Sequence, residues 1–394
     1  MASMNQSAGG LSKQIAQRLR TRIEDRAWEI GDKLPPVREL AEDFGVSTET
    51  VRGAMRELET LQLIETRPRQ GGFIKAYSSP PQLMSGVQHS QVAFVRTATD
   101  ISISPADVEG ADEWGVRLTL GVDRRLTDAD FSVTLVSAAP DEPQIVEALL
   151  NKLTRIGPGL AGVVVLFHEP LRPLVEELRR RGLPCVTIGS ESSGFSQNHV
   201  AAANLAAGRL VGRCFLRLGH RRLLYVSTAL SQRHSALDKF TGLMQGYVLE
   251  GSPPPTLEHA QSRDWSEAAG YDAVRAALQR GYRPEGIFTE GDFLAGGAIE
   301  ACLEAGLSVP GDVDVVGSGE IAISRRLRPP LTTIQQPAEQ LGLAAGEMIL
   351  RLVAGEVEQS ACEVLPTRMI VRDSLKKLPG LLDDPESACP VFMS

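Results

Sequence analysis

Four side chains near the N-terminus have the types and the spacing for binding a nucleic acid. Thr48, Glu49, Arg52 and Arg56 fall on the polar face of a segment whose apolar residues recur at helical spacing. Hydroxyl, carboxylate and guanidinium groups are those that proteins use to hydrogen-bond base edges and phosphate oxygens. The pattern therefore indicates a helix whose outward face is available for recognition.

The stretch from Leu34 to Leu61 predicts the two helices that would position these side chains. Apolar residues repeat at helical spacing before and after a tight turn at Gly45. Ser47 stands at the expected N-cap of the second helix, where its hydroxyl can accept a backbone N–H. A short helix, a turn with glycine and a second helix with a polar face are typical of a helix-turn-helix, whose second helix enters the major groove.

The segments on either side favour this interpretation over an ordinary helical hairpin. Upstream, an i, i+4 apolar stripe from Leu11 to Ile23 predicts a third helix that covers the pair. Downstream, two strand-like pieces at 63–66 and 73–77 flank a basic, glycine-rich turn. Arg67 and Arg69 in this turn can approach phosphates or a minor groove. Three helices followed by a basic hairpin predict a winged helix.

Roughly the first seventy residues of the chain, which include these segments, resemble the GntR-type winged helix. The matching motifs are QIAxxLRxxI, GDKLP, VRELA, GVSxxTVRxAMxxL and the closing GGFI. Two positions depart from the family pattern: Pro36 stands where Ser is frequent, and Gln70 replaces a common arginine of the wing. Carried over position by position, the resemblance implies DNA contacts from Arg38, Ser47, Thr48, Thr50, Arg52, Arg67, Arg69 and Gly71.

Length and composition indicate a soluble protein of two or three domains. The chain has 394 residues, of which 42% are hydrophobic and 23% charged, and its net charge is −8. The segment from Leu11 to Tyr77 carries 12 Lys and Arg against 11 Asp and Glu, a net charge of +1, so the remainder carries about −9. A basic surface for DNA must therefore be concentrated locally on the second helix and the wing.

Cysteine usage and the termini predict the cellular compartment. The five cysteines are scattered without metal-ligand spacing, so we expect reduced thiols and no metal site. The first ten residues lack the pattern of a secretory signal, and the longest apolar run is too short to cross a bilayer. We expect a cytoplasmic, nucleoid-associated protein without a membrane partner.

The remaining sequence predicts an α/β body behind a linker. We divide the chain into a disordered N-terminus (1–10), a winged helix (11–77), a Pro/Ser-rich linker (78–90), a body (91–374) and a mobile tail (375–394). In the body, short apolar runs alternate with amphipathic helical stretches, which is typical of βαβ units and parallel sheets. About eight such units favour two doubly wound α/β subdomains with a ligand between them, although the first helix of the body, within 101–126, has no clear pattern.

The body is similar to the lactose-repressor family. The segments NLAAGRLVGRCFLRLGHRRLLYV, GIFTEGDFLAGGAIEACLEAGLSVPGDVDVVGSGE and LTTIQQPAEQLGLAAGEMILRLVAGE match family motifs in the correct order. The resemblance implies a periplasmic-binding-protein-like domain that binds a small effector, usually a sugar, and that forms a homodimer. A GntR-type head on such a body is similar to the arabinose-repressor type of bacterial regulator.

Several positions that bind sugar in this family are altered here. Lys239 replaces an arginine, Gly291-Asp292 replaces Asn-Asp, Ala203-Asn204 replaces Asp-Asn, and Glu320 follows Gly319 at the place of an aspartate. Three interpretations stay open: an acidic or phosphorylated sugar anchored by Lys239, a neutral sugar held by carboxylates, or a body that only dimerises. The residues expected to line the ligand site are Asp100, Ser190, Asn204, Lys239, Asp292 and Glu320.

Together these patterns predict a DNA-binding transcription regulator, most readily a repressor, whose affinity for an operator in double-stranded DNA depends on a small ligand. No catalytic residue and no cofactor is expected. One alternative is a pyridoxal-phosphate enzyme fused to a GntR-type head, but the body has few lysines and its motifs oppose an aminotransferase. A periplasmic transport protein is disfavoured by the winged helix.

Overall fold

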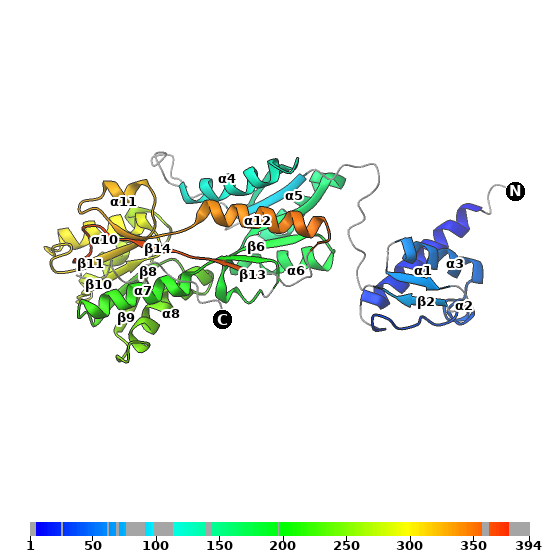
Figure 1. The fold of residues 1–394 in the computed structure, drawn as a ribbon, viewed down its shortest axis with the longest axis horizontal. Helices are drawn as coiled ribbons and strands as arrows, with labels where there is room; N and C mark the ends of the chain where they lie inside the picture. The colour runs from blue at the N-terminus through cyan, green and yellow to red at the C-terminus, as the bar shows by residue number, and fades with distance from the viewer. Residues whose placement is uncertain are drawn as a thin grey trace. The chain divides into compact units, whose positions relative to one another are not determined.

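The computed structural model describes residues 5–24, 27–60, 63–67, 71–75, 91–97, 113–138, 144–195, 197–356 and 362–377. The chain forms two compact units, and the second begins at His89. This boundary falls within the predicted linker at 78–90, all of which lies outside the described residues. We name the first unit the head and the second the body (Figure 1).

The head has the predicted winged-helix architecture. Its elements are α1 (Asn5–Glu24), α2 (Val37–Phe44), α3 (Thr48–Thr60), β1 (Ile64–Arg67) and β2 (Gly71–Ile74). β1 and β2 pair antiparallel, and one apolar core unites buried residues of all three helices and the hairpin. Gly45 ends α2 with a left-handed φ of 64°, a conformation that glycine adopts without steric cost.

Helix α1 corrects the predicted start of the first domain. It begins at Asn5, so the expectation of disorder over residues 1–10 is wrong for 5–10. The buried residues Ile15, Leu19 and Ile23 fix the second half of α1 on the core. Once a helix is nucleated in this way, adding residues at its end requires little further ordering, and this accounts for the earlier start.

The body contains two parallel-type sheets of six strands, as the sequence predicts. The first has the order β13-β7-β6-β5-β3-β4 with every pair parallel. Its strands are β3 (Gln91–Thr97), β4 (Ser132–Ala138), β5 (Leu160–Leu166), β6 (Cys185–Ser190), β7 (His199–Ala202) and β13 (Cys362–Leu365). It is covered by α4 (Glu113–Thr127) and α12 (Ala338–Val353) on one face, and by α5 (Ile145–Ile156) and α6 (Arg172–Arg180) on the other.

The second sheet has the order β14-β12-β11-β10-β8-β9, in which only β14 is antiparallel. Its strands are β8 (Arg222–Ser227), β9 (Thr256–Gln261), β10 (Gly286–Thr289), β11 (Asp314–Gly319), β12 (Thr332–Gln335) and β14 (Arg368–Ile370). Its helices are α7 (Asn204–Arg217), α8 (His234–Val248), α9 (Glu267–Gln279), α10 (Asp292–Glu304) and the short α11 (Ala322–Arg326). The chain passes from one subdomain to the other and back, because α12 and β13 return to the first sheet after β12 (Figure 1).

Close backbone packing fixes the position of α8. Helices α7 and α8 lie side by side, and a Cβ at Gly208 would collide with the carbonyl oxygen of Lys239. A Cβ at Gly242 would likewise collide with the carbonyl oxygen of Leu205. Larger residues at these positions would push the helices apart, so the glycines determine where the N-terminal half of α8 presents its side chains.

The body continues beyond the predicted boundary at Ser374. Leu375 is 1% exposed and belongs to the core of the second subdomain. The Ser374 hydroxyl donates to the Val315 carbonyl at 2.6 Å, and the Lys376 N–H donates to the Asp314 carboxylate at 2.5 Å. The predicted tail at 375–394 therefore starts too early, and residues 378–394 lie outside the described residues.

Candidate nucleic-acid interface and ligand cleft

The N-cap of α3 has the predicted geometry. The Ser47 hydroxyl oxygen accepts the backbone N–H of Thr50 at 3.1 Å and lies 2.8 Å from the Thr50 hydroxyl oxygen. Ser47 and Thr50 therefore hold the start of the helix as well as facing outward. Thr48 and Arg52 are exposed on the same face.

Glu49 joins the basic residues of α3 in a solvent-exposed cluster. Its carboxylate lies 3.5 Å from the Arg52 guanidinium and 3.3 Å from that of Arg56. All three side chains are at least 65% exposed. In such surroundings an ion pair contributes little to stability, so these groups can change partner when DNA approaches.

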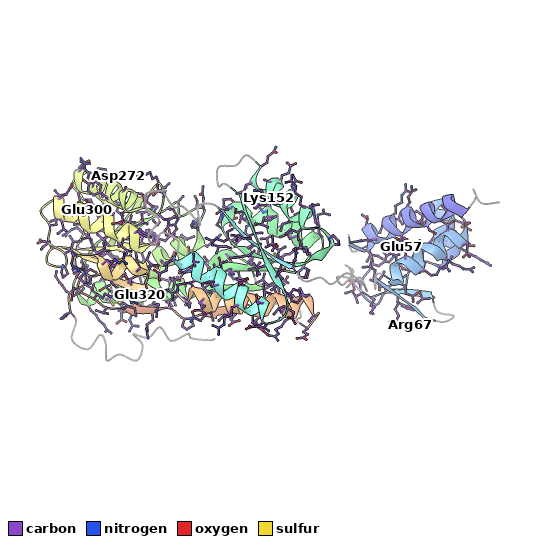
Figure 2. The ribbon with its side chains drawn as sticks, turned by 90° about the horizontal axis from the view of Figure 1, so that it is seen from above. Glu57, Arg67, Lys152, Asp272, Glu300 and Glu320 are labelled. Carbon is purple, nitrogen blue, oxygen red and sulfur yellow. The ribbon has the colours of Figure 1, made fainter. Side chains whose placement is uncertain are left out.

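The wing presents a second basic group. In the hairpin Arg67 stands opposite Gly71, whose φ of 104° favours glycine. The Arg67 guanidinium lies 4.6 Å from the centre of the Phe73 ring and 3.3 Å from the Glu65 carboxylate (Figure 2). Arg38 is exposed on α2. Arg69, also predicted to contact DNA, lies outside the described residues.

A cavity of about 210 Å³ lies between the two subdomains of the body. Ser190 and Asn204, from the first sheet and its connection, face Lys239 and Asp292 of the second subdomain across it. Four of the six predicted ligand residues are thus brought together. Asp100 lies outside the described residues. Further lining residues, with aromatic and charged side chains, are Trp114, Phe167, His168, Arg233, His234, Trp265, Glu290, Phe293 and Gln336.

Ser190 and Asn204 belong to a buried hydrogen-bond chain that crosses between the subdomains. The Ser190 hydroxyl donates to the Asp238 carboxylate of α8, and the Asn204 amide donates to the Ser190 hydroxyl oxygen at 3.2 Å. The Gln336 amide donates to Asn204 at 3.4 Å and to Ser318 at 3.3 Å. Because these groups are buried, opening the cleft must exchange their bonds for bonds to water.

Lys239 is a buried cation near the carboxylates of Glu290 and Asp238 and the guanidinium of Arg233. Its ammonium is buried and donates to the Ser235 carbonyl at 3.5 Å. Burial lowers the pKa of Lys239, while the carboxylates of Glu290 and Asp238 oppose that shift. Glu290 in turn accepts the hydroxyls of Thr228 at 3.3 Å and Ser235 at 3.2 Å. Lys239 therefore forms part of a compensated cluster rather than an isolated positive charge.

Asp292 is the buried carboxylate of the cleft. Its oxygens accept the Thr333 hydroxyl at 2.5 Å and the Ile321 N–H at 3.1 Å. Burial raises the pKa of Asp292 to about 6 in spite of these two bonds. The carboxylate lines the cavity and still has lone pairs that can accept hydroxyl groups of a ligand.

Glu320 is not part of the cavity lining, in contrast to the prediction. Its carboxylate accepts two bonds from the Arg372 guanidinium, at 2.6 and 2.8 Å, and two from that of Arg325, at 2.8 and 3.2 Å. The backbone at Glu320 is left-handed, with φ of 56°. Arg372 follows β14, which is distant in sequence, so this pairing could not be deduced from the motif around Gly319.

Sequence reasoning missed the aromatic side of the cleft. The Arg233 guanidinium lies 5.4 Å from the centre of the Trp265 ring, and both side chains line the cavity. A Cβ at Gly291 would lie 3.0 Å from the Trp265 ring. The signal was the glycine itself: Gly291 stands where the resembling family has asparagine, and it leaves room for the indole.

Three further contacts link the subdomains, beside the hydrogen bond between Ser190 and Asp238. The Glu169 N–H donates to the Gln232 carbonyl at 3.0 Å, and the Glu169 carboxylate lies 3.6 Å from the His234 ring nitrogen. On another side, the Ala322 N–H at the start of α11 donates to the Glu113 carboxylate at 2.6 Å. These contacts join the two subdomains around the cavity.

Two protein families match the chain. Residues 11–74 match the bacterial regulatory proteins of the gntR family, and residues 213–375 match the periplasmic binding protein-like domain. The chain therefore joins a region that matches the gntR family to a region that matches a periplasmic binding protein-like domain. The predicted winged helix and doubly wound body are confirmed, and an aminotransferase-like body is excluded.

The chain also resembles curated repressors over part of its length. It is 32% identical over 218 residues to the HTH-type transcriptional repressors PurR of Salmonella paratyphi B and Salmonella heidelberg. The match covers 55% of this chain and 63% of each repressor, so the chain spans less than two thirds of their length.

The fold is shared with two solved regulators. The CelR–cellobiose complex has a TM-score of 0.64 at 21% identity, and covers 86% of this chain and 100% of that one. The lac repressor dimer bound to operator and the anti-inducer ONPF has a TM-score of 0.64 at 21% identity. That match covers 75% of this chain and 97% of the lac repressor chain. Among the helices that the structure describes, none has the length and apolar character needed to cross a bilayer.

Proposed function

We propose that this chain is a sequence-specific DNA-binding transcription regulator, a repressor, whose operator affinity is controlled by a small ligand in the cleft. The observation that carries the proposal is that one chain has both an exposed, polar recognition helix and a cavity between two subdomains, lined by charged and aromatic side chains. The relatives named PurR are repressors, which supports the same direction of control. The protein would act in the cytoplasm, on the nucleoid.

The mechanism we propose is linkage between the two sites in a homodimer. A dimer places two α3 helices on half-sites about one helical turn of DNA apart. A ligand can change operator affinity only by its different affinity for the closed and open body. The cross-cleft contacts of Ser190 with Asp238, and of Glu113 with Ala322, are the bonds whose formation such a ligand would favour.

Among sugars, sugar acids and sugar phosphates, we favour a neutral sugar. The carboxylates of Glu290 and Asp238 act on Lys239 and would repel an acidic ligand beside it. Asp292 and Glu290 can accept hydroxyl groups, and the Trp265 indole provides a flat face for a sugar ring. A cavity of about 150 Å³ holds a benzene ring, so the 210 Å³ here suits a single sugar ring rather than two.

Tryptophan fluorescence gives a direct test of ligand binding. The chain has three tryptophans, and two of them, Trp114 and Trp265, line the cavity. A Trp28→Phe variant leaves only these two as reporters, so a neutral monosaccharide that binds there should change the emission and raise the melting temperature. Trp265→Ala should weaken the affinity by about tenfold, since aromatic contacts contribute about 0.5–1.5 kcal/mol beyond burial.

The outcomes separate the three interpretations of the cleft. A response to sugar acids or phosphates alone would restore Lys239 as the anchor. If no compound of a broad panel changed the fluorescence or the melting temperature while the protein still bound specific DNA, the body would be a dimerisation domain that binds no small ligand. If the chain bound every DNA duplex with equal affinity, the proposed function as a sequence-specific regulator would be ruled out. The ligand found should then be added to the protein–operator complex, where the proposal requires that the measured DNA affinity changes.

A further inference from the structure

Glu49 is an acidic residue at the N-terminal end of α3. In a helix-turn-helix this end of the second helix contacts the DNA bases. Glu49 is the second residue of the helix, 70% exposed, and it shares one helix face with Arg52 and Arg56. The residues near the start of a recognition helix are those that reach base edges. Glu49 is therefore placed where its carboxylate must meet either a base or a phosphate.

Neither packing nor capping accounts for a carboxylate at this position. The N-cap of α3 is made by Ser47 and Thr50, without Glu49. Its ion pairs with Arg52 and Arg56 are solvated, and such pairs stabilise a fold only slightly. An acid in the first turn interacts favourably with the helix dipole, but this effect is small and is screened by salt. Against DNA, the same charge is repelled by phosphates unless it finds a donor.

Cytosine supplies that donor in the major groove. Its edge presents the N4 amino group, and Glu or Asp is the side chain that accepts from it. Adenine also has an amino group, but its neighbouring N7 is an acceptor, which repels a carboxylate. Arginine is the usual partner of guanine, through O6 and N7.

We propose that Glu49 reads a cytosine in each operator half-site, beside a guanine read by Arg52. The inference rests on the proposed function, because it requires that α3 enters the groove. Three residues advance by about 4.5 Å along a helix, which is close to the spacing of about 3.4 Å between neighbouring bases. When DNA binds, Arg52 exchanges its carboxylate partner for guanine, and Glu49 exchanges its arginine partners for the cytosine amino group.

The test is a selection of bound duplexes from a random-sequence pool of double-stranded DNA, with the full-length protein and two variants. Glu49→Gln keeps the size of the side chain but adds an amide donor, which suits N6 and N7 of adenine. Glu57→Gln removes the same charge from the same helix, about 12 Å further along it (Figure 2). This control reports the general effect of weaker phosphate repulsion.

We expect the wild-type protein and Glu57→Gln to enrich the same motif, with cytosine next to guanine. Glu49→Gln should change only the cytosine position, to adenine, with a shift in base preference of about 5- to 150-fold. An unchanged motif, or an affinity change that is equal for all sequences, would show that Glu49 acts only on its arginine neighbours or on the helix, and would overturn the inference. If the wild-type protein enriched no motif, the proposed function would fail first and this inference with it.

Discussion

The carboxylates of Glu49 in the head and Glu320 in the body contact two arginines each, but in opposite surroundings. Glu49 is 70% exposed, and its ion-pair distances are 3.3 and 3.5 Å. The Glu320 side chain is 3% exposed and bonds Arg372 through both of its oxygens. The head thus keeps its charges solvated and ready to exchange partners, whereas the body uses charges to fix the ends of its strands and helices.

The difference has an energetic basis. Exposed pairs gain little because water screens them and side-chain entropy opposes them. Once a buried pair has formed, removing one partner leaves a charge without compensation. The same substitution of Glu by Gln should therefore change stability far more in the body than in the head, and the following predictions test this contrast.

The largest effect is expected from Glu320→Gln. It leaves the Arg372 guanidinium, which is only 17% exposed, beside a neutral amide. We expect a loss of about 3–5 kcal/mol in the unfolding free energy of the body, measured by urea denaturation. Lys152→Gln, on the exposed surface of the body, is a suitable control (Figure 2). A loss below about 1 kcal/mol would mean that the buried ion pair contributes no more to the unfolding free energy than an exposed one.

The pH dependence of the body provides the next test. The folded pKa of Asp292, about 6, lies above the usual 3.8. The folded state therefore binds this proton more tightly than the unfolded state, so ionisation of Asp292 opposes folding above pH 6 and this penalty disappears as pH falls toward 4. The two pKa values correspond to about 3 kcal/mol.

The measurement compares the wild-type protein with Asp292→Asn, which does not titrate. The unfolding free energy of the wild type, relative to that of the variant, should rise between pH 7 and pH 4. A constant difference across this range would show that Asp292 titrates alike in the folded and unfolded chain. The head should contribute nothing to this difference, because the substitution changes no group there.

A smaller effect, on DNA affinity rather than stability, is expected from Arg52→Ala. If Arg52 reads a base edge, operator binding should weaken by about 1–3 kcal/mol. Fluorescence anisotropy with the selected operator and with variants at the contacted base pair measures both affinity and preference. A uniform loss for every sequence would assign Arg52 to a phosphate instead.

The contrast also explains how far the sequence could be interpreted. The head was predicted almost element by element, because its contacts are local: Ser47 caps its own helix, and Arg67 pairs with Gly71 across a short hairpin. The two sheets of the body were predicted from alternating apolar runs. Helix α4 was not placed, because Gly115 and Gly121 weaken its helical pattern; a Cβ at Gly121 would collide with the Glu339 carbonyl oxygen of α12, a contact invisible in the sequence.

The cleft was harder to predict, because its chemistry depends on residues far apart in sequence. Asn204, Lys239 and Asp292 were identified from the resemblance and Ser190 from its place after an apolar strand, and all four line the cavity. Glu320 was assigned to the cavity from the motif around Gly319. Its true partner, Arg372, lies about fifty residues further along the chain and is not part of that motif. Lys239 was considered an anchor for acids because the sequence does not show that the carboxylates of Glu290 and Asp238 lie near it.

The smallest effect is expected from Glu49→Gln on the stability of the head. Both of its arginine partners are solvated, so removing the charge should change the unfolding free energy by about 0–1 kcal/mol. Thermal melting at low and high salt measures this, and added salt should abolish any difference that exists. A loss as large as that of Glu320→Gln would show that the head, like the body, uses its charges for folding. A small loss together with an altered operator motif would separate recognition from stability at a single side chain.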